Sequence, residues 1–270
     1  MTNLGYADKV VIITGGSSGI GKGCAEQFVQ AGAKVVICSN DQDEGSSVTA
    51  ALRAAAQRPG EADFIYCDVT RTEDLRNLID TTMSRYGRID CLINNAGWHP
   101  PHKPIDDFSI QEFRDLIELN LVSIFTASKF ALPHLRQTKG NIINMASLVA
   151  SIGQRHATTY VATKGAITAF TKALAVDEAP HGVRVNCVSP GNIMTPLWQE
   201  AIDASPEPQQ YRAAGEAAQL VGRMGRAEEV GRLCLFIAAA ATFTTGVDHI
   251  ISGGAELGYG QKSMSRELDT

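Results

Sequence analysis

The chain has 270 residues and a formal net charge of −5 at pH 7, and no run of like charges or low-complexity segment interrupts it. An acidic chain without a Lys/Arg-rich segment argues against a nucleic-acid-binding surface. The longest apolar run, 233–241, is too short to cross a bilayer. No membrane partner is therefore expected, and the polar stretch 1–9 favours a cytosolic protein.

The cysteines are scattered and form no C-x-x-C pattern, so they suggest neither a zinc site nor a disulfide framework. No metal site is predicted. We expect these thiols to be small buried packing residues; they are Cys24, Cys38, Cys67, Cys91, Cys187 and Cys234.

Short β-branched runs alternate with longer helical stretches along the chain. The expected strands are 10–14, 34–38, 63–67, 91–94, 141–145, 183–188 and 247–251. Most are apolar without alternation, as strands buried on both faces are, and the intervening segments are long enough for crossover helices. The prediction is an α/β fold: one Rossmann-type, doubly wound domain spanning 1–270, with a seven-stranded parallel sheet flanked by helices on both faces. Two helix starts carry capping-box signatures, Thr70 with Glu73 and Ser109 with Glu112.

A glycine-rich turn follows the first expected strand and opens a helix expected over 20–30. Its spacing is G-x-x-x-G-x-G, where glycines allow a tight turn and close approach of a pyrophosphate to the helix N-terminus. Glycines at a strand-to-helix junction also suit an ordinary turn, but the flanking strand and helix favour a dinucleotide site. Its candidate binding residues are Gly15, Ser17, Ser18, Gly19, Ile20 and Gly21.

The end of the second expected strand indicates which dinucleotide is bound. An acid is expected there for the ribose 2′-hydroxyl, but Ser39 follows the strand, with Asp41, Asp43 and Glu44 close behind. A 2′-phosphate wants a basic partner, and 14–21 and 35–52 contain none; Lys22 lies just inside the helix. NAD is therefore predicted as the cofactor, with Ser39 and Asp41 as contacts.

Two polar segments follow the third and fourth expected strands. Asp68, beside Val69, is placed to bind an adenine amine, although it also suits a helix start. Asn94 is followed by Asn95, Ala96 and Gly97 at the carboxyl edge of the sheet, where ligands bind in open α/β folds. A plain turn is the alternative for this second segment.

Asn120 and Ser147 are two polar residues in otherwise apolar surroundings. Asn120 lies in a helix crowded with apolar residues, and a buried amide must be hydrogen-bonded, either to the preceding turn or to an active-site water. The apolar surface of that helix suggests packing against another subunit. Ser147 ends the fifth strand, where a hydroxyl could bind a substrate oxygen.

Tyr160 and Lys164 are four residues apart, so on a helix they project from one face, one turn apart. A nearby ammonium lowers the pKa of a phenol from about 10, and reaching neutrality takes roughly 4 kcal/mol. Such a phenol exchanges protons with an alcohol. The spacing alone is a frequent coincidence on helices, but the glycine turn, Asn120 and Ser147 favour catalysis.

Taken together, these motifs resemble the short-chain dehydrogenase/reductase family from about residue 9 to residue 254. The resemblance implies a Rossmann fold and reversible hydride transfer between a nicotinamide and a hydroxyl or carbonyl carbon. It implies Tyr160 as acid/base, Lys164 as the group that lowers its pKa and holds the nicotinamide ribose, Ser147 as the substrate-positioning hydroxyl, and Asn120 as the holder of a water. Further implied cofactor contacts are Asn95, Ala96, Gly97, Pro190, Gly191, Ile193 and Thr195.

Stretches 94–101, 189–198 and 253–260 are similar to a branch of this family whose members oxidise 17β-hydroxysteroids or L-fucose. That resemblance implies an NAD-dependent, cytosolic homotetramer. The branch carries an aspartate where this chain has Ser39, so the ribose contact must weaken or pass to Asp41.

The expected substrate region comprises the loop 98–104, a mobile lid at about 194–220 and the tail 255–270. Its candidate lining residues are His99, Ser147, Gln154, Tyr160, Asn192, Leu197, Trp198 and Tyr259. The alternatives are an exposed loop residue for His99 and core packing for Trp198.

The apolar candidates suit a steroid, and the polar ones suit a sugar. We expect oxidation of a secondary alcohol such as the 17β-hydroxyl of estradiol or testosterone, with L-fucose oxidised to its lactone as the alternative. A nucleotide-sensing protein without activity is disfavoured because Ser147, Tyr160 and Lys164 are all present. A sugar-nucleotide epimerase would show different glycine spacing and a longer C-terminal region.

Overall fold

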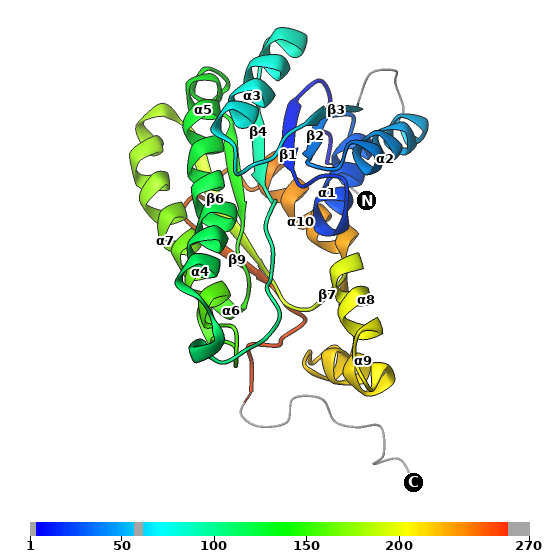
Figure 1. Ribbon diagram of the computed structural model, residues 1–270. Coiled ribbons are helices and arrows are strands. Elements are labelled where there is room, and N and C mark those ends of the chain that lie inside the picture. Colours follow the sequence, from blue (N-terminus) through cyan, green and yellow to red (C-terminus); the bar gives the residue numbers. More distant parts are fainter. Residues whose placement is uncertain (1–3, 57–61, 259–270) are drawn as a thin grey trace.

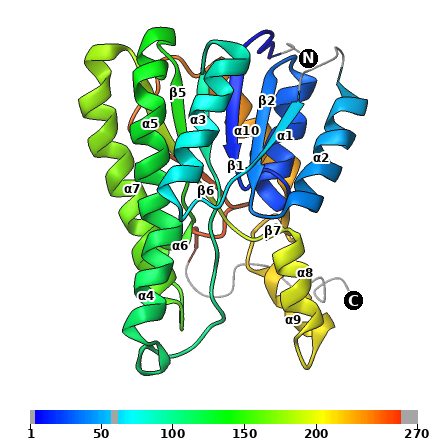
Figure 2. The same ribbon diagram turned by 45° about the horizontal axis from the view of Figure 1, so that its top comes forward.

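A computed structural model describes residues 4–56 and 62–258. Its centre is a parallel sheet of seven strands in the order β3-β2-β1-β4-β5-β6-β9, with helices on both faces (Figures 1 and 2). The strands are β1 (Val10–Thr14), β2 (Lys34–Ser39), β3 (Ala62–Tyr66), β4 (Cys91–Asn94), β5 (Asn141–Met145), β6 (Arg184–Pro190) and β9 (Asp248–Ile251). The predicted fold class is confirmed, and each predicted strand lies within two residues of an observed one.

Alternate residues of the central strands face opposite layers of helices. Val11 and Ile13 of β1 belong to a core shared with α1 (Gly19–Gln30), α2 (Gln42–Ala55) and α10 (Ala227–Ala239). Ile12 belongs to a second core shared with α3 (Thr72–Tyr86), α5 (Ser123–Thr138) and α7 (Thr158–Glu178). Because side chains alternate across a strand, this double burial requires strands that are apolar without interruption. The six cysteines are all free and buried, as predicted.

Helices α4 (Ile110–Ile117) and α5 are joined without a break through η2 (Glu118–Val122), a single π-helical turn. By length and composition alone, Ile110–Thr138 is apolar enough to cross a membrane, as core helices of soluble proteins also are. Here its buried residues pack in the core against α3 and α7. The capping box of Ser109 with Glu112 is present at the start of α4.

The capping box predicted for Thr70 and Glu73 is wrong. Helix α3 begins at Thr72 with Arg71 as its N-cap residue, and no side chain caps it. The Thr70 hydroxyl instead donates to Asp68 Oδ1, because a local turn offers that hydroxyl an acceptor before the helix begins.

The predicted lid consists of two helices, α8 (Pro196–Asp203) and α9 (Pro208–Ala217), which project beyond the sheet (Figure 1). A small parallel pair that the sequence did not predict, β7 (Ile193–Met194) with β8 (Gly225–Arg226), ties the two ends of this segment together. Across from the lid lie α4 and the short α6 (Val149–Ile152). The remaining short turns are η1 (Ile105–Asp107) and η3 (Ala179–His181).

Candidate active site

The glycine turn forms a site that fits a pyrophosphate at the N-terminus of α1. Gly15 and Gly19 have φ of +62° and +49°, which favour glycine. A Cβ on Gly21 would lie 2.1 Å from the Gly15 carbonyl oxygen. Ser18 is the N-cap residue but makes no side-chain capping bond, and the first turn contains no acid. The N–H groups of that turn therefore lack a side-chain acceptor, as an anion site requires.

The segment after β4 is hydrogen-bonded to the start of this turn. Asn95 Nδ2 donates to the carbonyl oxygens of Thr14 and Gly15, both at 3.0 Å. The Thr14 hydroxyl in turn accepts from the N–H groups of Asn95 and Ala96. The amide nitrogen of Asn95 thus holds the glycine turn, and the predicted cofactor contact of the segment from Asn95 to Gly97 stays a prediction. Thr14, which the sequence analysis did not select, is the partner that makes this possible.

At the end of β2, Ser39 and Asp41 hold the start of α2. Ser39 Oγ accepts from the Asp41 N–H at 3.0 Å, and Asp41 Oδ1 accepts from the Glu44 N–H at 2.8 Å as the N-cap of the helix. Glu44 reaches back to the glycine turn, where the Ser17 hydroxyl donates to its Oε2 at 2.6 Å. Glu44 was not among the predicted site residues, because this contact joins residues 27 positions apart.

After β3, Asp68 shapes the backbone. Its Oδ1 accepts from both the N–H and the hydroxyl of Thr70, and its own N–H donates to Asp74 Oδ2. These bonds fit the helix-start alternative for Asp68 and leave its adenine contact a prediction. Val69 is buried in the core.

The serine and the tyrosine of the predicted catalytic group come together. Ser147 follows β5, and Tyr160 is the third residue of α7. The Ser147 hydroxyl is hydrogen-bonded to the phenol, which lowers its pKa, but burial has the larger effect and raises the pKa of Tyr160 to about 12. The predicted lowering of this pKa is therefore not met in the protein alone, because burial disfavours the charged phenolate.

Lys164 lies one turn further along α7, with its Nζ 5.5 Å from the centroid of the Tyr160 ring. The Nζ donates to the Met145 carbonyl oxygen at 2.9 Å. Lys164 is only 5% exposed, and burial lowers its pKa to about 8. The cation that was predicted to act on the phenol thus keeps its charge at pH 7 but loses its proton at a lower pH than an exposed lysine does.

Asn120 connects the loop after β4 to α7. It lies in the π-helical turn and is 1% exposed. Its Oδ1 accepts from the Trp98 N–H at 2.9 Å, and its Nδ2 donates to the Trp98 carbonyl and to Thr163 Oγ1. Thr163 Oγ1 donates to the Tyr160 carbonyl. These bonds are long-range, so the alternative of a bond to the preceding helical turn is wrong, while the predicted water stays a prediction.

The chain after β6 passes close to the glycine turn. Pro190 ends β6, and a Cβ on Gly191 would lie 3.0 Å from Ser252 Cα. Ile193 is buried. Thr195 caps α8, and its Cγ2 lies 3.4 Å from the position of a Cβ on Gly19. The predicted nicotinamide side of the site and the predicted pyrophosphate side are therefore adjacent.

Two predicted substrate residues meet beside the tyrosine. The imidazole of His99 packs on the ring of Tyr160 with centroids 4.1 Å apart. His99 Nε2 lies 3.1 Å from Gln154 Oε1, and its Nδ1 lies 2.6 Å from the Pro100 carbonyl oxygen. An imidazolium would donate to both oxygens, and a neutral ring to only one. The site thus presents a polar pair next to the phenol.

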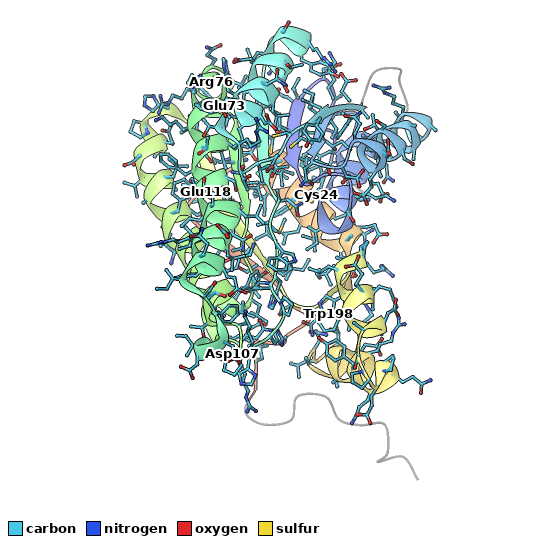
Figure 3. All side chains as sticks on the ribbon, in the orientation of Figure 1. Cys24, Glu73, Arg76, Asp107, Glu118 and Trp198 are labelled. Carbon is cyan, nitrogen blue, oxygen red and sulfur yellow. The ribbon has the colours of Figure 1, made fainter. Side chains whose placement is uncertain are left out.

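The remaining substrate candidates are placed differently. Asn192 Nδ2 donates to the Gly215 carbonyl in α9, and Trp198 packs against Tyr211 with ring centroids 5.6 Å apart (Figure 3). Both side chains therefore contact α9, and their predicted contact with the substrate stays a prediction. Leu197 is 45% exposed. Tyr259 lies outside the described residues.

This arrangement places a phenol, a serine hydroxyl and a lysine near one another at the carboxyl edge of β5. A phenol bonded to a serine hydroxyl can exchange a proton with an alcohol held by both. A dinucleotide seated on the glycine turn would supply a hydride acceptor. The residues present therefore fit oxidation of an alcohol or reduction of a carbonyl group.

Comparisons with known proteins agree with this chemistry. Residues 15–256 match the family described as Enoyl-(Acyl carrier protein) reductase. An L-fucose dehydrogenase of Bos taurus is 53% identical over 258 residues, covering 96% of this chain and 93% of that protein. The structure of the aldohexose dehydrogenase of Thermoplasma acidophilum is similar with a TM-score of 0.82 and 34% identity, covering 93% of this chain and 94% of that one.

The L-sorbose reductase from Gluconobacter frateurii, solved in complex with NADPH and L-sorbose, is similar with a TM-score of 0.89 and 27% identity. That match covers 94% of this chain and 98% of the reductase. The matched residues 15–256 include the glycine turn and the Tyr160 site. The chain belongs to the short-chain dehydrogenase/reductase family, and it is an oxidoreductase that acts on alcohol groups.

Proposed function

We propose that this enzyme oxidises L-fucose, or an aldose of closely similar configuration, at its anomeric carbon with NAD as hydride acceptor. The 53% identity to a bovine L-fucose dehydrogenase carries the proposal. The contact of His99 with Gln154 beside Tyr160 agrees with it, because a sugar needs polar partners where it is buried. The comparisons favour the sugar over the steroid that the sequence analysis put first.

The residues act on the anomeric hydroxyl as follows. Ser147 binds the hydroxyl oxygen, and Tyr160 takes its proton as the carbon–oxygen double bond forms. A bound NAD would supply the acceptor for the hydride of the anomeric carbon, and the product would be the lactone. Before it can take this proton, the buried Tyr160 phenol must lose its own. We propose that Lys164, whose Nζ lies 5.5 Å from the Tyr160 ring centroid, stabilises the phenolate when the cofactor is bound.

The polar side chains beside the phenol bear on the choice between the two substrate classes. His99 and Gln154 can offer hydrogen-bonding groups to a sugar hydroxyl, whereas a steroid would cover them with apolar surface that makes no hydrogen bond. The tryptophan that was to form an apolar slot, Trp198, packs inside the lid instead. The sugar alternative therefore fits the side chains nearest the phenol.

The deciding experiment compares kcat/KM for L-fucose, its mirror image D-fucose, and estradiol, each with NAD. We expect L-fucose to exceed both by at least about a hundredfold, as a site built to hydrogen-bond several hydroxyls discriminates strongly. Tyr160→Phe is the inactive control. A larger kcat/KM for estradiol would refute the proposal, and so would equal values for the two fucose enantiomers.

We also propose NAD rather than NADP. The segment after β2 contains Asp41, Asp43 and Glu44 and no basic residue up to position 52, so a 2′-phosphate would meet only negative charge. Comparing kcat/KM for the two dinucleotides at saturating L-fucose tests this, and a higher value for NADP would overturn it.

Finally, we propose that the enzyme is a homotetramer. Two apolar surfaces support this: one on α4, α5 and α7, with Ile110, Phe125 and Val176 at least half exposed, and one beside the edge strand β9, with Phe243 and Ile250 exposed. Two separate apolar surfaces allow two different two-fold contacts. Light scattering after size exclusion should give four times the mass of the chain, and a monomer would contradict the proposal.

A further inference from the structure

We propose that Glu44 is the acid that binds the adenosine ribose of the dinucleotide and sets the preference for NAD. This inference rests on the dinucleotide part of the proposed function. The feature that carries it is the hydrogen bond from the Ser17 hydroxyl in the glycine turn to Glu44 Oε2 in the first turn of α2, at 2.6 Å.

This bond closes a ring of contacts around the place where the ribose is expected. The Gly16 N–H donates to the Cys38 carbonyl at 3.1 Å, which fixes the glycine turn against the end of β2. Ser17 follows in the turn and is 4% exposed. Its hydroxyl therefore holds the Glu44 carboxylate beside both the turn and the strand end. In doubly wound folds, the acid that binds the ribose 2′-hydroxyl lies beside these two elements.

None of the other polar side chains named for this segment has a hydrogen bond to the glycine turn. Ser39 Oγ accepts from the Asp41 N–H, and Asp41 Oδ1 caps α2. Asp43 is exposed and has no hydrogen bond to the glycine turn. Within the part of the chain that the structure describes, the Glu44 carboxylate has a hydrogen-bond partner at one oxygen, Oε2. The second oxygen, Oε1, can accept from a ribose hydroxyl.

The chemistry explains how an enzyme of this fold functions with Ser39 at the end of β2. A carboxylate accepts hydrogen bonds from the two ribose hydroxyls of NAD and repels the 2′-phosphate of NADP. Glu44 supplies that charge from the next helix, and Ser17 positions it. A buried hydroxyl that is already in place reduces the side-chain freedom that Glu44 loses when the ribose binds.

The test measures the Kd of NAD and of NADP by isothermal titration calorimetry on the folded enzyme, for the wild type and three variants. Glu44→Gln keeps an acceptor for Ser17 and removes the charge. We expect its Kd for NAD to rise about tenfold and its Kd for NADP to fall about tenfold, as loss of one charge-assisted hydrogen bond and one repulsion predicts. Ser17→Ala should raise the Kd for NAD about threefold, since the carboxylate remains but is no longer held.

Asp43→Asn is the matched control, because it removes the same charge one residue away without touching the turn. We expect it to change each Kd by less than about twofold, as an exposed charge is largely screened. Equal changes in both Kd values for Glu44→Gln would mean that Glu44 only ties α2 to the turn, and would overturn the inference. So would equal effects of Glu44→Gln and Asp43→Asn, or a wild type that prefers NADP. A wild type that binds neither dinucleotide would refute the proposed function as well.

Discussion

Replacing Lys164 by methionine should make the protein more stable at pH 7 while it removes activity. Burial lowers the pKa of Lys164 from 10.5 to about 8. At 1.36 kcal/mol per pKa unit, this corresponds to about 3 kcal/mol by which the folded state disfavours the ammonium. Lys164→Met removes that cost but leaves the Met145 carbonyl without its donor, a loss of about 2 kcal/mol. The net expected gain at pH 7 is about 1 kcal/mol.

The stability difference between Lys164→Met and the wild type should depend on pH. Below pH 8 the lysine is charged in both states, so the folded protein carries the whole cost. Between pH 8 and 10.5 the folded state loses its proton first, the unfolded state binds more protons, and stability rises with pH. The advantage of Lys164→Met over the wild type should therefore shrink across this window.

Urea unfolding of the cofactor-free protein at pH 7 and pH 9.5 measures the difference between the two proteins. Lys172→Met is the matched control, since Lys172 lies on the same helix and is exposed; it should change the free energy of unfolding by less than about 0.5 kcal/mol. If Lys164→Met is less stable than the wild type by the same amount at both pH values, the reasoning from burial is refuted.

Four further changes test other parts of the site. Gly21→Ala places a Cβ 2.1 Å from the Gly15 carbonyl oxygen, so it should raise the Kd for NAD at least about tenfold by titration; an unchanged Kd would contradict the proposed pyrophosphate position. Asn120→Ala removes three hydrogen bonds to Trp98 and Thr163, and should lower the free energy of unfolding by about 2–3 kcal/mol and kcat with it; full kcat would show that the Trp98 loop needs no anchor. Gly215→Ala drives a Cβ to 2.3 Å from Met224 Cε and 3.0 Å from Trp198, and should raise KM for the sugar while the Kd for NAD stays within about twofold; equal effects on both would argue against a lid. Tyr160→Phe should lower kcat at least about a thousandfold with the Kd for NAD nearly unchanged by titration, and appreciable turnover would exclude Tyr160 as the acid/base.

Local patterns were enough to predict the strands, because each is a short apolar run that must be buried on both faces. β1, β4 and β5 begin and end at the predicted residues. The glycine turn could also be read from the sequence, since its function depends on backbone conformations that few residues other than glycine adopt. The start of α3 could not be read from the sequence, because Asp68 accepts from the Thr70 hydroxyl that was predicted to cap the helix.

The tertiary structure was needed wherever a side chain chooses between distant partners. The partners of the Asn95 and Asn120 amides are one example: Asn95 donates to the Thr14 and Gly15 carbonyls, and Asn120 bonds the Trp98 backbone and Thr163 Oγ1. Their predicted contacts with a cofactor and a water stay predictions. Asn192 and Trp198, which were predicted to line the substrate site, also contact α9, and the sequence did not indicate this packing. Nothing in the local pattern ranks such partners, because the competition is decided by distances in the folded state.

The sequence by itself determined the family, the parallel sheet and the residues Ser147, Tyr160 and Lys164, since these depend on residue type and on spacing along strands and helices. Only the tertiary structure decided the protonation energetics of that group. Burial raises the pKa of Tyr160 to about 12 and lowers that of Lys164 to about 8, and the degree of burial depends on packing around the site. The same holds for Glu44, which joins the glycine turn only because folding brings Ser17 within 2.6 Å of it.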